Sequence, residues 1–306
     1  MLLTAGCTRP SGSAAVGACP TFPADSYWHH DVSSLPVASS SADWVASIGA
    51  TSHVHADFGS GLWDGGPIGI PVTTVGAGQA RVPVSFDYAD ESDPGPYPLP
   101  FNAAIEGGAA SSGDRHVLVI DQSDCRLYEV YDAHPGATAA GAWSAGSGAV
   151  YDLRSNALRP SGWTSADAAG LPILPGLVRY EEVAAGHVDH AIRFTAPRTQ
   201  RAFIWPARHQ AGSSTSTALP PMGAWFRLRA DYDTSRLTGS ALIIARAMKT
   251  YGIVLADNGS SWYISGAPDS HWDNDELHQL DVIRGADFQA VDTSSMIVDP
   301  NSGQAR

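Results

Sequence analysis

The segment Ser52-His53-Val54-His55-Ala56-Asp57-Phe58-Gly59 indicates the fold class that we expect for this chain. Polar and apolar side chains alternate along it, which is the two-residue period of a β-strand with two different faces. In a strand, His53, His55 and Asp57 would share one face. Two imidazoles and a carboxylate on one face can bind a divalent metal ion or exchange a proton with a substrate, and the segment alone does not decide between them.

Short strand-like runs continue through most of the chain. They are rich in Val, Ile, Tyr, Phe and Trp, and Gly, Pro, Asn or Asp separates most of them. A barrel of βα units would need a helix after each strand, so the pattern favours a mainly β fold built as a two-sheet β-sandwich or jelly roll. Besides 52–58, the predicted strands are 68–75, 81–87, 116–121, 125–132, 149–153, 187–195, 202–205, 225–230, 253–256 and 262–265.

Helical patterns are few. Ser41 is a good N-cap for a short helix that ends at Ile48, before Gly49. A longer helix is predicted over 235–251, and a shorter one begins near Asn274, whose side chain can cap it. We expect these helices to cover one end of the sandwich.

The domain organisation follows from composition. Residues 25–292 show no convincing internal linker, so they are predicted to form a single β-sandwich domain. Residues 1–24 are interpreted as a signal remnant followed by a flexible tether rich in Ser, Gly, Ala and Pro. Residues 293–306 are predicted to be a frayed tail.

The cysteines bear on the compartment. The start of the chain, Met1-Leu-Leu-Thr-Ala-Gly-Cys7, resembles the end of a bacterial lipoprotein signal, which implies an exported protein anchored through a lipid on Cys7. Cys19 and Cys125 then remain as an even pair. In an oxidising compartment they could form one disulfide, and two unrelated thiols are the alternative.

The charge balance excludes one class of partner. With 31 acidic against 18 basic residues, the net charge is -13, which repels nucleic acid and anionic lipid. An uncharged ligand such as a polysaccharide is compatible with this charge. No stretch approaches the ~20 apolar residues of a membrane span, so membrane contact is expected only through a lipid on Cys7.

The acidic loop Asp90-Glu91-Ser92-Asp93 is followed by the rigid Pro94-Gly95-Pro96-Tyr97-Pro98. Such a backbone holds carboxylates in place, which a general acid or a nucleophile requires. A calcium loop is a second functional interpretation, and a solvated acidic turn is the structural one. Glu91 and Asp93 are therefore candidate catalytic residues.

Two ionisable groups lie within apolar alternation. Glu129 shares a strand face with Leu127 and Tyr131, so it is either a paired core group or a cleft residue with a raised pKa. His190 lies between Val188 and Ile192, where a hydrogen-bonded core histidine is the common outcome. Arg193 alternates to the opposite face, which we expect to be solvated.

The chain is rich in aromatic residues, with nine Trp and ten Tyr, and several lie beside turns. Exposed rings near polar side chains bind sugars by stacking, whereas buried rings fill the core. The candidate substrate-binding residues are Trp163, Asp167, Trp205, His209 and Trp262. No nucleophile elbow, phosphate-binding loop, zinc-protease motif or dinucleotide fingerprint occurs.

Together these patterns predict an exported glycoside hydrolase that acts on extracellular polysaccharide without a cofactor, using one carboxylic acid and a second carboxylate. The candidate catalytic residues are Asp57, Glu91, Asp93, Glu129, His55, His116 and His190. One alternative is an enzyme with a divalent metal ion on His53, His55 and Asp57. The other is a non-catalytic, lectin-like surface protein.

Overall fold

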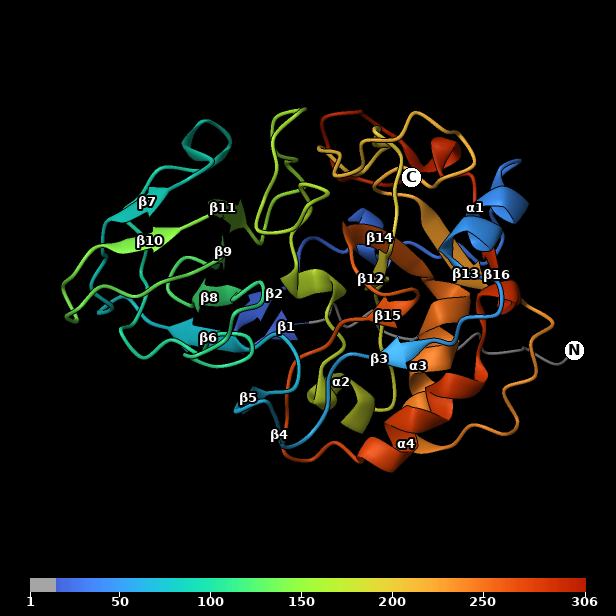
Figure 1. The fold of residues 1–306 in the computed structure, drawn as a ribbon, viewed down its shortest axis with the longest axis horizontal. Helices are drawn as coiled ribbons and strands as arrows, with labels where there is room; N and C mark the ends of the chain where they lie inside the picture. The colour runs from blue at the N-terminus through green and yellow to red at the C-terminus, as the bar shows by residue number, and fades with distance from the viewer. Residues whose placement is uncertain (1–14) are drawn as a thin grey trace, which may run out of the picture.

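Two main β-sheets carry the fold in the computed structural model, which describes residues 15–306 (Figure 1). The four-stranded sheet has the order β11 (Ser147–Asp152), β9 (Arg126–Tyr131), β8 (Val117–Asp121) and β6 (Val72–Val75). The six-stranded sheet has the order β16 (Phe288–Ala290), β13 (Trp225–Leu228), β14 (Ile253–Asn258), β12 (Ile192–Ala196), β15 (Tyr263–Ile264) and β3 (His55–Ala56). The prediction of a β-rich fold is confirmed.

Short two-stranded pairs complete the described strands. They are β1 (Ala15–Val16) with β2 (Cys19–Pro20), β4 (Leu62–Trp63) with β5 (Gly66–Pro67), and β7 (Val84–Phe86) with β10 (Trp143–Ala145). The predicted strand at 202–205 forms only a single β-bridge, from Phe203 to Met222. The predicted strand at 52–58 shortens to the two residues of β3, at the edge of the six-stranded sheet.

Several strand pairs are parallel, including β12 with β14 and β6 with β8. A parallel pair needs a crossover connection, and the chain between β12 and β14 supplies one through β13 and helix α3 (Gly239–Thr250). Strands covered on both faces are apolar throughout rather than alternating, and Ile253, Val254, Leu255 and Ala256 of β14 are all buried. The last two residues of β14, Asp257 and Asn258, differ from this run because they are polar and not fully buried.

The remaining helices are short. Helix α1 (Ser41–Ile48) covers the predicted residues, but its N-cap is Ser40 rather than Ser41, whose hydroxyl accepts a hydrogen bond from the Ala290 N–H instead. Helix α2 (Tyr180–Ala184) was not predicted, and α4 (Asn274–His278) begins where expected. The cap of α4 is Asp273 rather than Asn274, because the Asp273 carboxylate accepts hydrogen bonds from two backbone N–H groups of the first turn. The described 3-10 turns are Tyr27–His29, Ala89–Glu91, Leu174–Gly176, Gln279–Val282, Gly285–Asp287 and Ser294–Met296.

Helix α3 begins later than the sequence pattern predicts. Its first residue, Gly239, has a φ of 48°, and the carboxylate of Glu276 on α4 accepts hydrogen bonds of 2.9 Å from both the N–H and the hydroxyl of Ser240. A carboxylate at a helix N-terminus satisfies free N–H groups and complements the helix dipole. Helix α4 thus fixes where α3 starts.

The hydrophobic core has two parts, separated by the four-stranded sheet. The larger part joins Leu118 and Leu127 of that sheet to Phe194 and Trp225 of the six-stranded sheet. The smaller part covers the opposite face of the four-stranded sheet with Val119, Val130, Tyr97 and Trp143, among others. Because successive residues of a strand alternate, Glu129 is directed toward the larger core.

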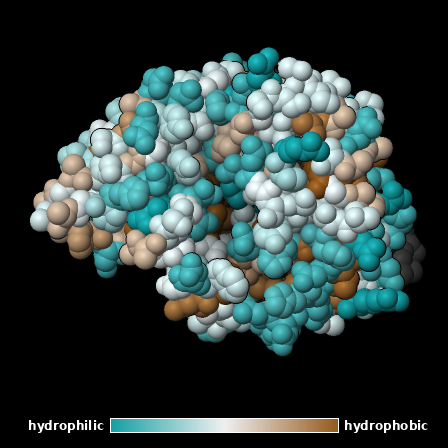
Figure 2. Space-filling view, in the orientation of Figure 1, coloured by the Kyte–Doolittle hydropathy of each residue, from teal (hydrophilic) through white to brown (hydrophobic). Residues whose placement is uncertain are grey.

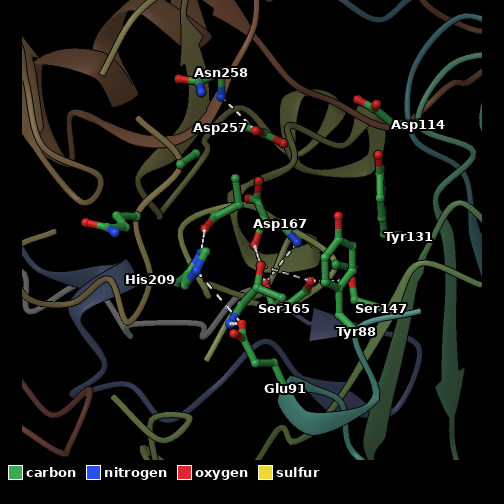
Figure 3. Close-up of a pocket in the computed structure, with 15 residues that line it drawn as sticks. Tyr88, Glu91, Asp114, Tyr131, Ser147, Ser165, Asp167, His209, Asp257 and Asn258 are labelled. Atoms are coloured by element: carbon green, nitrogen blue, oxygen red, sulfur yellow. Dashed lines mark hydrogen bonds and ion pairs between the residues drawn. The ribbon is translucent and has the colours of Figure 1, made fainter. Parts of the chain in front are cut away.

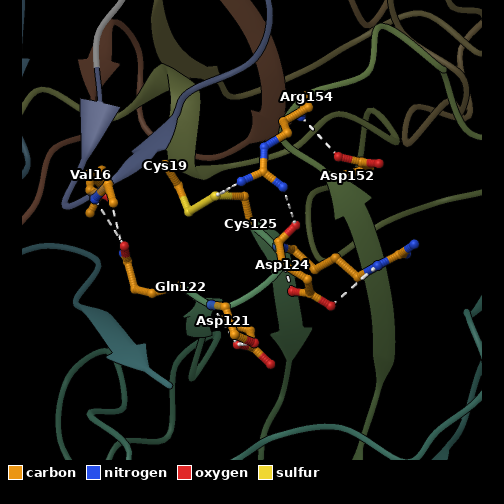
Figure 4. The surroundings of a disulfide bond; sticks show 11 residues. Val16, Cys19, Asp121, Gln122, Asp124, Cys125, Asp152 and Arg154 are labelled. Atoms are coloured by element: carbon orange, nitrogen blue, oxygen red, sulfur yellow. Dashed lines mark hydrogen bonds and ion pairs between the residues drawn. A yellow bond between two sulfur atoms is a disulfide. The ribbon is translucent and has the colours of Figure 1, made fainter. Parts of the chain in front are cut away.

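Residues 15–24 are packed against the body rather than forming the expected tether. A disulfide joins Cys19 to Cys125 with a Cα–Cα distance of 5.4 Å, so the predicted pairing is present (Figure 4). Gln122 accepts a hydrogen bond from the Ala18 N–H and donates one to the Val16 carbonyl. The predicted lipid site, Cys7, lies outside the described residues.

Residues 293–306 are also packed, unlike the expected frayed tail. Met296 is buried, and the backbone N–H of Tyr27 donates to the carbonyl of Gly303 at 2.8 Å. The apolar run Met296-Ile297-Val298 is too short to show a helix or strand period, so the sequence did not reveal this packing.

Hydrophilic side chains predominate on the face in Figure 2, and hydrophobic residues form separate small patches. Within residues 15–306, none of the helices combines the length and the apolar composition that crossing a bilayer requires.

Candidate functional site

A cavity of about 390 Å³ lies where ends of both main sheets meet several loops (Figure 3). This volume is within the ~300–1,000 Å³ of small-molecule sites. The four-stranded sheet contributes Tyr131 and Ser147, and the end of β14 contributes Asp257 and Asn258. Loop residues complete the wall, and we call this cavity the acidic pocket because its lining includes Glu91, Asp114, Asp167 and Asp257.

Arg193 of β12 organises the inner wall of the acidic pocket. Its guanidinium binds Asp167 through two hydrogen bonds of 2.8 Å and the hydroxyl of Ser265 through one of 2.7 Å. Such a bidentate pair fixes the geometry of both groups. The Asp167 side chain has no exposed surface, and the pairing raises the pKa of Arg193 although burial opposes its charge. The expectation that Arg193 faces solvent was therefore wrong.

Asp257 is the second carboxyl group that Arg193 reaches, at 3.3 Å, and its side chain remains 20% exposed. Burial raises the pKa of Asp257 to about 7, the negative charge of Asp167 adds to this, and Arg193 opposes it. A carboxyl group that keeps its proton near neutral pH can donate that proton to a bound molecule. Asp257 is thus a candidate general acid.

Asp114 lies at the same end of the acidic pocket, in the loop before β8 (Figure 3). Its side chain is exposed, and its negative charge contributes to the raised pKa of Asp257. Tyr131 lies beside it, and burial together with the charge of Asp114 raises the pKa of that phenol. This end of the pocket therefore holds two carboxyl groups, the largely buried Asp257 and the exposed Asp114. Acid and base catalysis requires such a difference in environment.

Glu91 and His209 lie at the other end (Figure 3). The Thr164 N–H donates to the Glu91 carboxylate at 2.9 Å, and Nε2 of His209 lies 3.8 Å from the same oxygen. Nδ1 of His209 donates to the carbonyl of Ala168 at 3.0 Å, which fixes the ring. Between the two ends, Tyr88 exposes 55% of its surface and offers an aromatic face to a ligand.

Behind the pocket wall, a buried ion pair supports the loop at 164–168. Nδ1 of His116 donates to the Glu106 carboxylate at 2.6 Å, and Nε2 donates to the carbonyl of Ala166 at 2.9 Å. Burial opposes the charge on His116, but Glu106 overrides it and raises the pKa to about 9. His116 therefore stabilises the wall as an imidazolium and does not line the cavity.

The structure brings three of the predicted site residues together, namely Glu91, Asp167 and His209. Asp93 does not line the acidic pocket, because it is paired with the Arg159 guanidinium and accepts from the Val150 N–H at 2.8 Å.

Two predicted catalytic residues are sealed in the interior instead. Glu129 has no exposed surface, and its carboxylate accepts hydrogen bonds from the N–H groups of Ile173 and Leu174. Burial raises its pKa to about 7, and these two donors oppose the rise. His190 is equally buried, between the carbonyl of Ala191 at 2.8 Å and the carboxylate of Glu182 at 3.2 Å. Neither group can reach a substrate.

The histidine-rich segment lies elsewhere. His53 and His55 line a separate open groove with Tyr263 and Asp281, and Nδ1 of His55 is 3.8 Å from the Asp281 carboxylate. Asp57 does not line that groove. Within residues 15–306, no three His, Cys, Asp or Glu side chains are arranged as a metal site, so the predicted His53, His55 and Asp57 set is not assembled.

The predicted tryptophan platforms are largely core residues. Trp262 is fully buried and stacks on Phe194 at 5.4 Å and on Phe288 at 5.1 Å. Trp205 is buried, with its indole N–H donating to the Ser302 carbonyl at 2.9 Å. Trp163 lies against the Arg159 guanidinium, outside the lining of the acidic pocket. The aromatic residues of the pocket are tyrosines instead.

Asp257, Asp114, Arg193 and Tyr88 were missed as site residues. One signal was available, because Asp257-Asn258 directly follows the apolar run Ile253–Ala256, and polar groups at the end of a buried strand often line a site. Three comparisons, with protein-family models, curated proteins and solved structures, found no match to this chain.

Proposed function

We propose that the protein is a glycoside hydrolase whose reaction takes place in the acidic pocket. Asp257 protonates the glycosidic oxygen, and the bond from that oxygen to the anomeric carbon breaks. Asp114 supplies the second carboxylate: it either bonds to the anomeric carbon and is later displaced by water, or it removes a proton from the water that attacks that carbon. Water is the only co-reactant, and Asp257 regains its proton from solvent or from the attacking water.

One observation supports this proposal more strongly than the metal-dependent and lectin-like alternatives. Asp257 is a carboxyl group held at a pocket wall beside the buried Arg193 and Asp167 pair, and it reaches a cavity that also contains a second carboxylate. The acidic lining is compatible with hydroxyl-rich sugars, and the exposed ring of Tyr88 can stack on a sugar face. These residues replace Asp57, Glu91, Asp93 and Glu129 as the proposed acid and base.

The remaining expectations belong to the same proposal. A two-sheet sandwich or jelly roll is the architecture that we propose for the β-rich scaffold. Export to the cell surface or the extracellular space is supported by the Cys19–Cys125 disulfide, because such bonds persist in oxidising compartments. A polysaccharide or oligosaccharide is the proposed ligand, with no cofactor and no nucleic acid.

A panel of oligosaccharides with analysis of the products tests the reaction. We expect cleavage of at least one member, and a loss of at least ~100-fold in kcat for Asp257→Asn, because a general acid contributes about 10²–10⁴-fold. Asp114→Asn is expected to lose activity as well. Asp64→Asn, at an exposed hairpin position outside the pocket, is the matched control and should retain it.

Three results would contradict the proposal. Binding of sugars without cleavage under any condition would favour the lectin-like alternative. Cleavage with full activity in Asp257→Asn and Asp114→Asn would show that the reaction occurs elsewhere. If activity required an added divalent metal and was lost in His55→Ala, the metal-dependent alternative would replace this assignment.

A further inference from the structure

The charges around the acidic pocket are unbalanced. In the described part of the chain, no lysine or arginine side chain lines the cavity, whereas four carboxyl-bearing residues do. The Arg193 guanidinium is bound to Asp167 and Asp257 behind the wall. Arg159 is likewise paired with Asp93 outside the lining. Because Arg193 offsets the charge of Asp167 and Asp257, the excess negative charge that the pocket presents to a ligand comes from Glu91 and Asp114.

Glu91 is the carboxylate best placed to bind a positively charged group of a ligand. The Thr164 N–H holds one of its oxygens at 2.9 Å, and the Glu91 backbone carbonyl accepts a hydrogen bond of 2.8 Å from Arg159, so both side chain and backbone are positioned. Its side chain is 31% exposed, which leaves room for a ligand. It also lies at the end of the cavity away from Asp257 and Asp114 (Figure 3).

We propose that the acidic pocket selects a sugar unit that carries a positively charged amino group, and that Glu91 pairs with that ammonium. This inference rests on the proposed sugar-binding function of the same pocket and names its substrate class. Tyr88 stacks on the ring of the sugar, and the net charge of -13 attracts a cationic polymer over a longer range. Uronic acids, which carry a carboxylate, are repelled.

Binding of monosaccharides tests this without knowledge of the linkage. The probes are glucosamine, galactosamine and mannosamine, each paired with its N-acetylated form, in which the ammonium is replaced by a neutral amide on the same ring. We expect at least one amino sugar to bind about fivefold more tightly than its neutral counterpart, the size typical of partly exposed ion pairs. Raising NaCl from about 0.02 M to about 0.5 M should reduce this preference.

Two variants assign the effect to Glu91. Glu91→Gln keeps an oxygen for the Thr164 N–H but removes the charge, and it should abolish the preference for the amino sugar. Asp90→Asn removes the neighbouring acidic side chain, which is exposed and does not line the pocket, and it should retain the preference. Thermal melts of both variants verify that they fold.

The outcomes separate this inference from the proposed hydrolase. Cleavage of neutral oligosaccharides with equal binding of amino and N-acetylated sugars overturns the inference and leaves the hydrolase intact. A salt-sensitive preference that Glu91→Gln abolishes supports the inference even when no oligosaccharide is cleaved. A preference that persists in Glu91→Gln, or that Asp90→Asn removes, also overturns it.

Discussion

Glu129 and Asp257 are two carboxyl groups with the same raised pKa, about 7, in opposite surroundings. Glu129 lies in the sealed core and is bound by two backbone N–H groups, whereas Asp257 lies at the end of β14, reaches a cavity and contacts Arg193. Burial raises both pKa values, so the shift itself does not mark a catalytic group. Access to a ligand distinguishes the two, and each prediction below tests that distinction.

The largest effect is expected from Arg193→Ala. This substitution leaves Asp167 buried without its bidentate partner, and an unpaired buried charge costs about 3–5 kcal/mol of folding free energy. Urea unfolding at pH 7 measures the loss. Arg229→Ala, which removes a guanidinium paired with Asp231 at the surface, should leave the unfolding midpoint unchanged. Equal midpoints for the two variants would show that Arg193 does not organise the pocket wall.

The pH dependence of activity sharpens the role of Asp257. As a general acid it must be protonated, so kcat/KM should fall as the pH rises through about 7, by about tenfold per unit well above that value. The residual activity of Asp257→Asn should lack this decline. A decline that is unchanged in Asp257→Asn but absent in Glu129→Gln would show that Glu129, and not Asp257, is the general acid.

Glu129→Gln should alter stability without altering activity. A carboxyl group with a raised pKa in the folded state stabilises most below its unfolded pKa, near 4.5, and that contribution is lost as the pH rises through about 7. The loss amounts to about 3 kcal/mol, because one pKa unit corresponds to about 1.4 kcal/mol. Between pH 4.5 and 7, the free energy of unfolding measured with urea should therefore fall by about 3 kcal/mol less in Glu129→Gln than in the unsubstituted protein. An equal fall in both proteins would contradict the raised pKa of Glu129.

The same contrast explains what could be predicted from the sequence. Helix α1 and strands β8 and β9 follow from local patterns, because apolar runs and a terminating glycine such as Gly49 act over a few positions. The disulfide could be predicted as one of two outcomes once Cys7 was set aside as a lipid site. The acidic pocket was not, since Asp257 becomes a site residue only through Arg193 and Asp114, which approach it from distant parts of the chain. Alternation placed Arg193 on the correct side of its strand but could not show that Asp167 and Ser265 cover that face.

Aromatic residues repeat the distinction between sealed and accessible groups, and here the expected effect is smallest. Trp262 was predicted to be a sugar platform and is buried between Phe194 and Phe288, whereas Tyr88 exposes more than half of its surface at the pocket. Tyr88→Ala should weaken sugar binding about fivefold, because a stacking aromatic contributes roughly 1 kcal/mol, and Tyr88→Phe should preserve binding. Titration calorimetry with the tightest monosaccharide of the panel measures both. Full affinity in Tyr88→Ala would mean that exposure alone does not make this ring a platform, and the sugar would then be bound by the polar groups of the pocket.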